Sequence, residues 1–127
     1  MATILFIEDE AALQKALGDY LRESGHTVVP ALDGEDGLRR LRRHRPDLIL
    51  LDLIVPRLAG LEVLEQIRND PKLHTIPVIV LTNIDSTESV EKAMALGAAA
   101  YLVKTNYSLE EVGAKIAHVL EDQMGTR

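Results

Sequence analysis

The sequence contains no cysteine, which excludes disulfide bonds, thiolate catalysis and zinc–thiolate sites and is in keeping with a reducing compartment. No apolar run approaches the ~18 residues of a membrane-spanning helix. Glu8, Asp9 and Glu10 interrupt the N-terminal apolar run too early for a signal peptide. These absences predict a soluble cytoplasmic protein with no membrane partner.

Positive charge is also scarce, with 14 Lys and Arg residues against 20 Asp and Glu and a formal net charge of −6. This balance argues against direct binding of nucleic acid or an anionic membrane, because both are polyanions. Five arginines nevertheless cluster in one short stretch: Arg39, Arg40, Arg42, Arg43 and Arg45. Because a helix C-terminus favours cations, we interpret this cluster as a solvated helix end, with a nucleic-acid patch as the alternative.

The chain has the composition of one globular domain. Its 127 residues are 46% hydrophobic and 27% charged, which predicts a single domain over residues 1–127. Short apolar runs alternate with helix-length amphipathic stretches five times. The runs are Ile4–Ile7, Thr27–Ala31, Leu48–Leu51, Val78–Leu81 and Ala100–Val103.

Five such units predict an α/β fold. The most apolar runs are typical of strands buried on both faces, as in a parallel sheet. Right-handed crossovers then give a doubly wound five-stranded sheet in a flavodoxin-like three-layer sandwich, for which the order 2-1-3-4-5 is suitable. Part of a barrel is the weaker alternative, because a barrel needs eight units. In this order the first and third strands meet at the switch point where ligands bind.

Capping residues and breakers delimit the five helices. The first is expected to end at Gly25, a residue suited to a left-handed C-terminal position. The last is expected to begin at Ser108, which forms a capping box with Glu111. The predicted helices run from about Ala11 to Ser24, from after Asp33 to before Pro46, through Leu61, Leu64 and Ile67 to before Pro71, from a start within residues 85–88 to Gly97, and from Ser108 onward.

Polar side chains follow four of the five predicted strands. Glu8 and Asp9 follow the first strand, Asp52 the third, Thr82 the fourth and Lys104 the fifth. Carboxylates on neighbouring strands repel one another and are costly to desolvate, so we expect them to share a cation. Oxygen ligands around an open position suit Mg²⁺. The lysine ammonium and the threonine hydroxyl could then contact a phosphoryl group.

Several rival sites lack their motifs in this sequence. No G-x-G-x-x-G or Walker lysine motif follows a strand, and no nucleophile elbow is present. The segment Asp52-Leu53-Ile54 lacks the second acid of aspartyl-phosphate phosphatases. Acids, a lysine, a hydroxyl and Mg²⁺ together are the parts needed to receive a phosphoryl group on a carboxylate.

These residues resemble the receiver domain of bacterial two-component response regulators over the whole chain. The resemblance rests on Glu8-Asp9 after the first strand, Asp52-Leu53-Ile54-Val55-Pro56 followed by Gly60, Thr82, and Tyr101-Leu102-Val103-Lys104. The separations also agree, because Thr82 lies 30 residues after Asp52 and Lys104 lies 52 after it.

The resemblance implies a phosphorylation-dependent signalling switch and not an enzyme that acts on an outside substrate. Asp52 would accept the phosphoryl group from a histidine kinase or a histidine phosphotransfer protein. Asp9, Asp52 and the carbonyl of Ile54 would bind Mg²⁺ directly, and Glu8 would act mainly through water.

The same resemblance assigns the switch and the output. Lys104 would contact the phosphoryl group, while Thr82 and Tyr101 would change the surface of the fourth helix, fifth strand and fifth helix. We expect no effector domain after the last helix of this chain, so the downstream partner is an unknown protein or the output lies outside the sequence.

Three departures from the family pattern qualify these expectations. Thr105 stands where proline is usual, so we expect a trans peptide bond after Lys104. Asn83 replaces a common alanine beside the phosphoryl pocket. The segment before Tyr101 lacks the aspartates of many DNA-binding members, which predicts a monomer in the unphosphorylated state. The alternatives are a pseudo-receiver that only binds proteins and a true phosphohydrolase.

Overall fold

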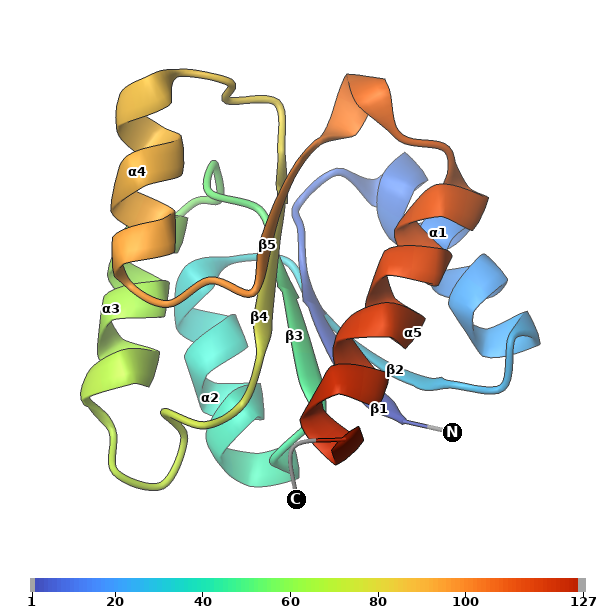
Figure 1. The fold of residues 1–127 in the computed structure, drawn as a ribbon, viewed down its shortest axis with the longest axis horizontal. Coiled ribbons are helices and arrows are strands. Elements are labelled where there is room, and N and C mark those ends of the chain that lie inside the picture. The colour runs from blue at the N-terminus through green and yellow to red at the C-terminus, as the bar shows by residue number, and fades with distance from the viewer. Residues whose placement is uncertain (1, 126–127) are drawn as a thin grey trace.

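A computed structural model describes residues 2–125 as a five-stranded parallel sheet between two layers of helices (Figure 1). The sheet order is β2-β1-β3-β4-β5, which confirms the predicted doubly wound fold. The strands are β1 (Thr3–Ile7), β2 (Thr27–Ala31), β3 (Leu48–Leu51), β4 (Val78–Thr82) and β5 (Ala100–Val103). The helices are α1 (Ala11–Glu23), α2 (Gly34–His44), α3 (Gly60–Asn69), α4 (Thr87–Ala95) and α5 (Leu109–Gly125), with a 3₁₀ turn at Lys104–Asn106.

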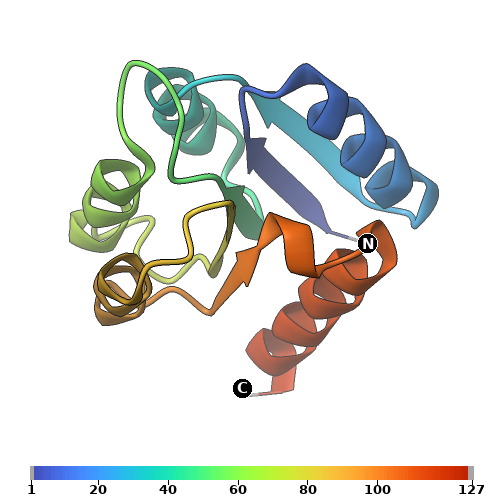
Figure 2. The same ribbon diagram turned by 90° about the horizontal axis from the view of Figure 1, so that it is seen from above.

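Two hydrophobic clusters hold the helices to the two faces of the sheet. Helices α2, α3 and α4 cover one face, and α1 and α5 cover the other (Figures 1 and 2). Alternate residues of β1 serve the two clusters, because Leu5 and Ile7 face the first layer while Ile4 and Phe6 face the second. The central strands are therefore apolar on both sides, as their sequence predicted.

The predicted helix signals operate as expected. The side chain of Asp33 accepts a hydrogen bond from the Asp36 amide at 2.7 Å. Ser108 and Glu111 form the reciprocal capping box, with distances of 2.8 and 3.1 Å. Gly25 has a φ of 100°, a left-handed conformation that glycine adopts without strain.

Gly60 allows α3 to begin directly beside the end of β3. A Cβ atom at this position would lie 2.5 Å from the carbonyl oxygen of Asp52 and 2.5 Å from the Cα of Leu53. Because only glycine fits, this residue brings the first turn of α3 against the segment that carries Asp52.

No helix within residues 2–125 is long and apolar enough to cross a membrane.

Candidate phosphorylation site

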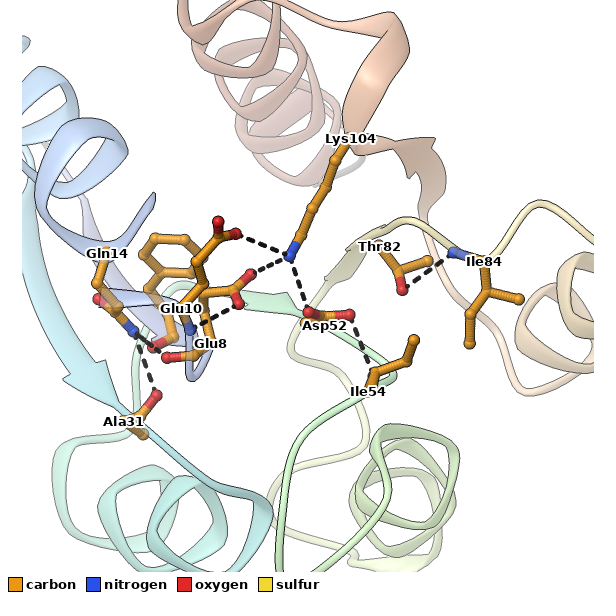
Figure 3. Close-up of polar contacts among 10 residues, drawn as sticks. Glu8, Glu10, Gln14, Ala31, Asp52, Ile54, Thr82, Ile84 and Lys104 are labelled. Atoms are coloured by element: carbon orange, nitrogen blue, oxygen red, sulfur yellow. Dashed lines mark hydrogen bonds and ion pairs between the residues drawn. The ribbon is translucent and has the colours of Figure 1, made fainter. Parts of the chain in front are cut away.

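Four strands end at one edge of the sheet and bring their polar residues together there (Figure 3). The pairing of β1 with β3 places Asp52 beside Glu8, and the Asp52 amide donates to the Ile7 carbonyl at 3.0 Å. Glu8 is 1% exposed and Asp52 is 4% exposed. Two buried carboxylates on adjacent strands require cationic neighbours, as the sequence predicted.

Lys104 is the cation that reaches both buried carboxylates. Its Nζ donates to Asp52 Oδ2 at 2.9 Å and lies 2.7 Å from Glu8 Oε1. Burial disfavours its charge, but the close contacts with Glu8 and Asp52 outweigh burial and raise the pKa of Lys104. Glu10, which the sequence argument left without a role, adds a third carboxylate 3.7 Å from the same ammonium.

Glu8 retains an oxygen that forms no hydrogen bond of regular geometry. Its Oε2 accepts from the Glu10 amide at 3.0 Å, whereas the contact of Oε1 with Lys104 is an ion pair without hydrogen-bond geometry. Burial raises the pKa of Glu8, and the charge of Asp52 adds to this effect, although Lys104 opposes it. A buried carboxylate oxygen whose contact with Lys104 lacks hydrogen-bond geometry fits a second cation at this site.

Carboxylate oxygens of Glu8, Asp9 and Asp52 lie within 4.8 Å of one another and could hold a metal ion. Asp9 is exposed, so one side of the cluster opens to solvent. The ligand atoms are carboxylate oxygens and one side of the site is open to water, which are the features of a Mg²⁺ site. The Ile54 amide donates to Asp52 Oδ1 at 3.1 Å, so Ile54 lies at the cluster. That the Ile54 carbonyl binds the metal stays a prediction.

The two predicted switch residues lie beside the site and form no hydrogen bond with each other. Thr82 is fully buried at the end of β4, one residue inside the strand instead of after it, and its Oγ1 accepts from the Ile84 amide at 3.4 Å. The Tyr101 hydroxyl donates to the Ile84 carbonyl at 2.6 Å. Burial and the charges of Asp85 and Asp52 raise the pKa of Tyr101.

Gln14 is a site residue that the sequence argument missed. Its Nε2 lies 2.9 Å from the Phe6 carbonyl, 3.1 Å from the Glu8 carbonyl and 3.2 Å from the Ala31 carbonyl, so it joins the ends of β1 and β2 at the acidic cluster (Figure 3). A signal was present in the sequence, because Gln14 lies in helical register with Leu17, on the apolar face of its helix.

The departures from the family pattern are accommodated without unusual backbone. No peptide bond among residues 2–125 is cis, so the expected trans bond after Lys104 is confirmed. The chain there forms a 3₁₀ turn in which Thr105 is exposed. Asn83 is also exposed at the end of β4.

The arginine cluster lies at the C-terminal half of α2, as predicted. Arg39 and Arg40 pair with Asp36 at 2.6 and 2.8 Å, which supports the interpretation of a solvated helix end. Arg42, Arg43 and Arg45 are exposed.

Curated proteins are similar to this chain in sequence. The transcriptional regulatory protein AfsQ1 of Streptomyces coelicolor is 42% identical over 104 residues, which are 82% of this chain and 45% of that protein. The response regulator MprA of Mycobacterium leprae is 38% identical over 117 residues, 92% of this chain and 50% of that protein. The chain spans about half the length of the curated relatives it matches.

Solved structures extend the likeness. The Mn(2+)-bound form of the response regulator Rcp1 is 30% identical with a TM-score of 0.81 and covers 94% of this chain and 91% of its own. The BeF3-activated N-terminal receiver domain of Klebsiella pneumoniae RstA is 26% identical with a TM-score of 0.85, over 93% of this chain and 97% of its own. Residues 4–117 match the response regulator receiver domain. The chain therefore belongs to the response regulator receiver domain family, whose members have phosphoacceptor signalling roles.

Proposed function

We propose that this chain is a phosphorylation-dependent switch in which Asp52 accepts a phosphoryl group from a histidine kinase or a histidine phosphotransfer protein. The contact that carries the proposal is the 2.9 Å hydrogen bond from Lys104 Nζ to Asp52 Oδ2 at the centre of the acidic cluster. The arrangement places a carboxylate nucleophile between a fixed ammonium and a group of hard-oxygen metal ligands.

The proposed transfer begins from an Asp52 carboxylate whose two oxygens have different partners, the Ile54 amide at Oδ1 and Lys104 at Oδ2. The Ile54 amide holds Oδ1 at 3.1 Å and so fixes the plane of the carboxylate. An oxygen of Asp52 attacks phosphorus, the P–N bond to the donor imidazole breaks, and its electron pair leaves with the ring nitrogen, which takes a proton from solvent water. The carboxylate is a ready nucleophile because it needs no base to remove a proton.

The surrounding residues stabilise the charge on the transferred group. Lys104 already lies at Asp52 and donates to a phosphoryl oxygen when the group arrives. Thr82, at the end of the neighbouring strand, supplies a hydroxyl donor. Asp9, Asp52 and the Ile54 carbonyl would hold Mg²⁺, with Glu8 acting through water, and the bound ion would supply positive charge toward the phosphoryl oxygens. The Mn(2+)-bound neighbour Rcp1 supports a divalent site.

The switch then works through local contacts that reach the α4–β5–α5 surface. Thr82 moves toward the phosphoryl group, and its neighbour Ile84 is hydrogen-bonded both to it and to Tyr101. Movement of the loop after β4 therefore changes the position of the tyrosine, which turns inward and alters what a downstream protein meets. The unphosphorylated chain is expected to be a monomer at micromolar concentration.

Intact-protein mass spectrometry after incubation with acetyl phosphate and Mg²⁺ tests the proposal. The expected result is one added phosphoryl group in the wild type and in Asp85→Asn, and none in Asp52→Asn. Asp85 is the matched control because it is an exposed acid near Tyr101 that lies outside the metal-ligand cluster.

Three other outcomes of that experiment would overturn the proposal. An unmodified wild type would identify a pseudo-receiver that only binds proteins. Catalytic consumption of acetyl phosphate without a stable adduct would identify a phosphohydrolase. Persistent modification of Asp52→Asn at one other position would exclude Asp52 as the acceptor.

A further inference from the structure

Helices α2 and α3 border a hollow of about 760 Å³ on the outer face of their layer. Its apolar part consists of Leu38, which is buried, and Leu58, which is half-buried. Exposed Arg39, Arg42 and Arg43 line the same hollow and outnumber its one acid, Glu35. An apolar floor beside several cations is the pattern of a surface that binds a partner with an acidic rim.

Two of these arginines have no counter-ion. Arg39 pairs with Asp36, but Arg42 and Arg43 form no ion pair with any residue in the described range 2–125. Like charges three and four positions apart on a helix repel one another. The helix C-terminus offsets part of this cost, and an external carboxylate would offset more of it.

The neighbouring ridge of α3 carries the opposite charge. Glu62 and Glu65 border a second hollow of about 450 Å³ toward α4, together with the apolar side chains of Leu61 and Leu96. Neither glutamate has an ion-pair partner within the described part of the chain. Lys92 also lines this hollow, but it pairs with Glu88 at 3.0 Å.

The side-by-side arrangement of basic and acidic strips selects the kind of partner. A polyanion such as nucleic acid would be attracted by Arg42 and Arg43 and repelled by Glu62 and Glu65 on the next helix. No aromatic side chain lines the basic hollow on which a base could stack. A fitting partner instead carries an acidic strip beside a basic strip, with apolar side chains near both.

The α2–α3 face of a second copy of this chain has that pattern. We infer that two copies associate through this face about a two-fold axis, so that Glu62 and Glu65 of each copy lie against Arg42 and Arg43 of the other. A two-fold contact uses the same patch on both partners, and each charge contact therefore occurs twice. Helices α2 and α3 lie in one helix layer (Figures 1 and 2), whereas Asp52 directly follows β3 at the edge of the sheet.

The association is expected to be weak and salt-dependent. Exposed ion pairs contribute little each, and two shallow hollows bury a small area of the transient class. We expect a dissociation constant on the order of 0.1–1 mM in low salt, so the chain is a monomer at low micromolar concentration.

Sedimentation equilibrium over about 10 µM to 1 mM tests the inference, because this range spans the expected constant. The wild type should show a monomer–dimer equilibrium that weakens at least about fivefold in high salt. Arg42→Glu with Arg43→Glu should stay monomeric, and so should Glu62→Lys with Glu65→Lys. An equimolar mixture of these two variants should form a heterodimer, because each then presents the charges that the other needs.

Matched variants control for folding and for net charge. Glu110→Lys with Glu121→Lys makes the same charge change as Glu62→Lys with Glu65→Lys, but on exposed positions of α5. This control should leave the monomer–dimer equilibrium unaltered. The neutral pairs Arg42→Gln with Arg43→Gln and Glu62→Gln with Glu65→Gln should weaken it without charge reversal. Circular dichroism confirms that each variant is folded before it is counted.

Four results would overturn the inference. They are a wild type that stays monomeric at 1 mM, dimers that the charge reversals leave unchanged, failure of the mixture to associate, and oligomers larger than a dimer. A foreign acidic partner or nucleic acid would be recognised by binding of an acidic peptide or an oligonucleotide to the wild type that Arg42→Gln with Arg43→Gln removes.

Discussion

The hydroxyl of Tyr101 donates a 2.6 Å hydrogen bond to the carbonyl of Ile84 and ties β5 to the loop that follows β4. The amide of the same Ile84 donates to Thr82 Oγ1 at 3.4 Å. One residue thus connects both proposed switch side chains. We therefore expect a displacement of Thr82 toward Asp52 to reach Tyr101 through Ile84.

Replacing Tyr101 with phenylalanine should lower the free energy of unfolding by about 1 kcal/mol, because the Ile84 carbonyl loses its donor. Amide hydrogen exchange in residues 83–86 should become faster. Urea unfolding and exchange measured by mass spectrometry check both. Tyr107→Phe is the control, since that ring is 38% exposed. Equal destabilisation by the two substitutions would contradict a specific role for the Tyr101 hydroxyl.

Replacing Asp52 with asparagine should raise the free energy of unfolding in metal-free buffer by about 1 kcal/mol, the scale of one like-charge contact. Lys104 keeps its 2.7 Å contact with Glu8, so removing the Asp52 charge relieves repulsion and leaves that ion pair in place. Urea unfolding in EDTA and in MgCl₂ makes the comparison. Mg²⁺ should stabilise the wild type and not the variant, and a variant that is less stable in EDTA would contradict this account.

Replacing Asp9 with alanine should weaken Mg²⁺ binding at least about tenfold, because the cluster loses its exposed ligand. Binding to the wild type is itself expected to be weak, since an open octahedral site retains several waters. Chemical-shift titration near Asp52 and Ile54 measures both affinities. Glu10→Ala removes a neighbouring carboxylate outside the cluster and should change the affinity little. Unchanged affinity in the Asp9 variant would contradict the proposed ligands.

The phosphorylated state should be long-lived because the two residues at the rim of the site are isoleucines. Ile54 is 59% exposed and Ile84 is half-buried, and neither side chain can accept a hydrogen bond from an attacking water. Ile54→Asn combined with Ile84→Glu should speed loss of the phosphoryl group by roughly tenfold, equal to about 1.4 kcal/mol of barrier. Decay of radiolabelled protein measures the rate. Equal or slower decay in the double variant would show that water is controlled elsewhere.

Asp36 should make stability depend on pH in the acid range. Burial raises the pKa of Asp36, but the hydrogen bonds and charges of Arg40 and Arg39 outweigh it, so the pKa lies below its ordinary value of 3.8. Its stabilising effect is therefore complete above that value and lost as the pH falls through the lower folded-state pKa. Asp36→Asn should cost about 0.5–1 kcal/mol at pH 7 and much less near pH 3. Urea midpoints at both pH values give the difference, and an equal cost at pH 3 would refute it.

The elements of the fold could be predicted because their signals are local. Asp33, Ser108 and Glu111 cap the helices through contacts within three residues along the chain. The apolar runs identified the strands, and only their ends differed, as where β4 includes Thr82. Parallel strands with short crossovers leave few ways to arrange five units, so the sheet order also followed from the pattern.

The site was predictable in its members but not in its contacts. Residues that end neighbouring parallel strands must meet at one edge, which is why Asp52 and Lys104 could be assigned to one place. The sequence does not show that Glu8 is 1% exposed with one oxygen outside hydrogen-bond geometry, or that Gln14 lies within 3.2 Å of three carbonyl oxygens. These properties depend on side-chain rotamers and on segments far apart along the chain.

The sequence by itself determined the α/β class, the five units and the polar edge, because hydrophobic period, capping and strand ends act between near neighbours in the chain. The tertiary structure alone decided that Ile84 links Thr82 to Tyr101, and that the arginine-bearing helix α2 packs beside α3, which carries Glu62 and Glu65. Such relationships arise only when packing brings distant segments within a few ångströms, where hydrogen bonds and charges act.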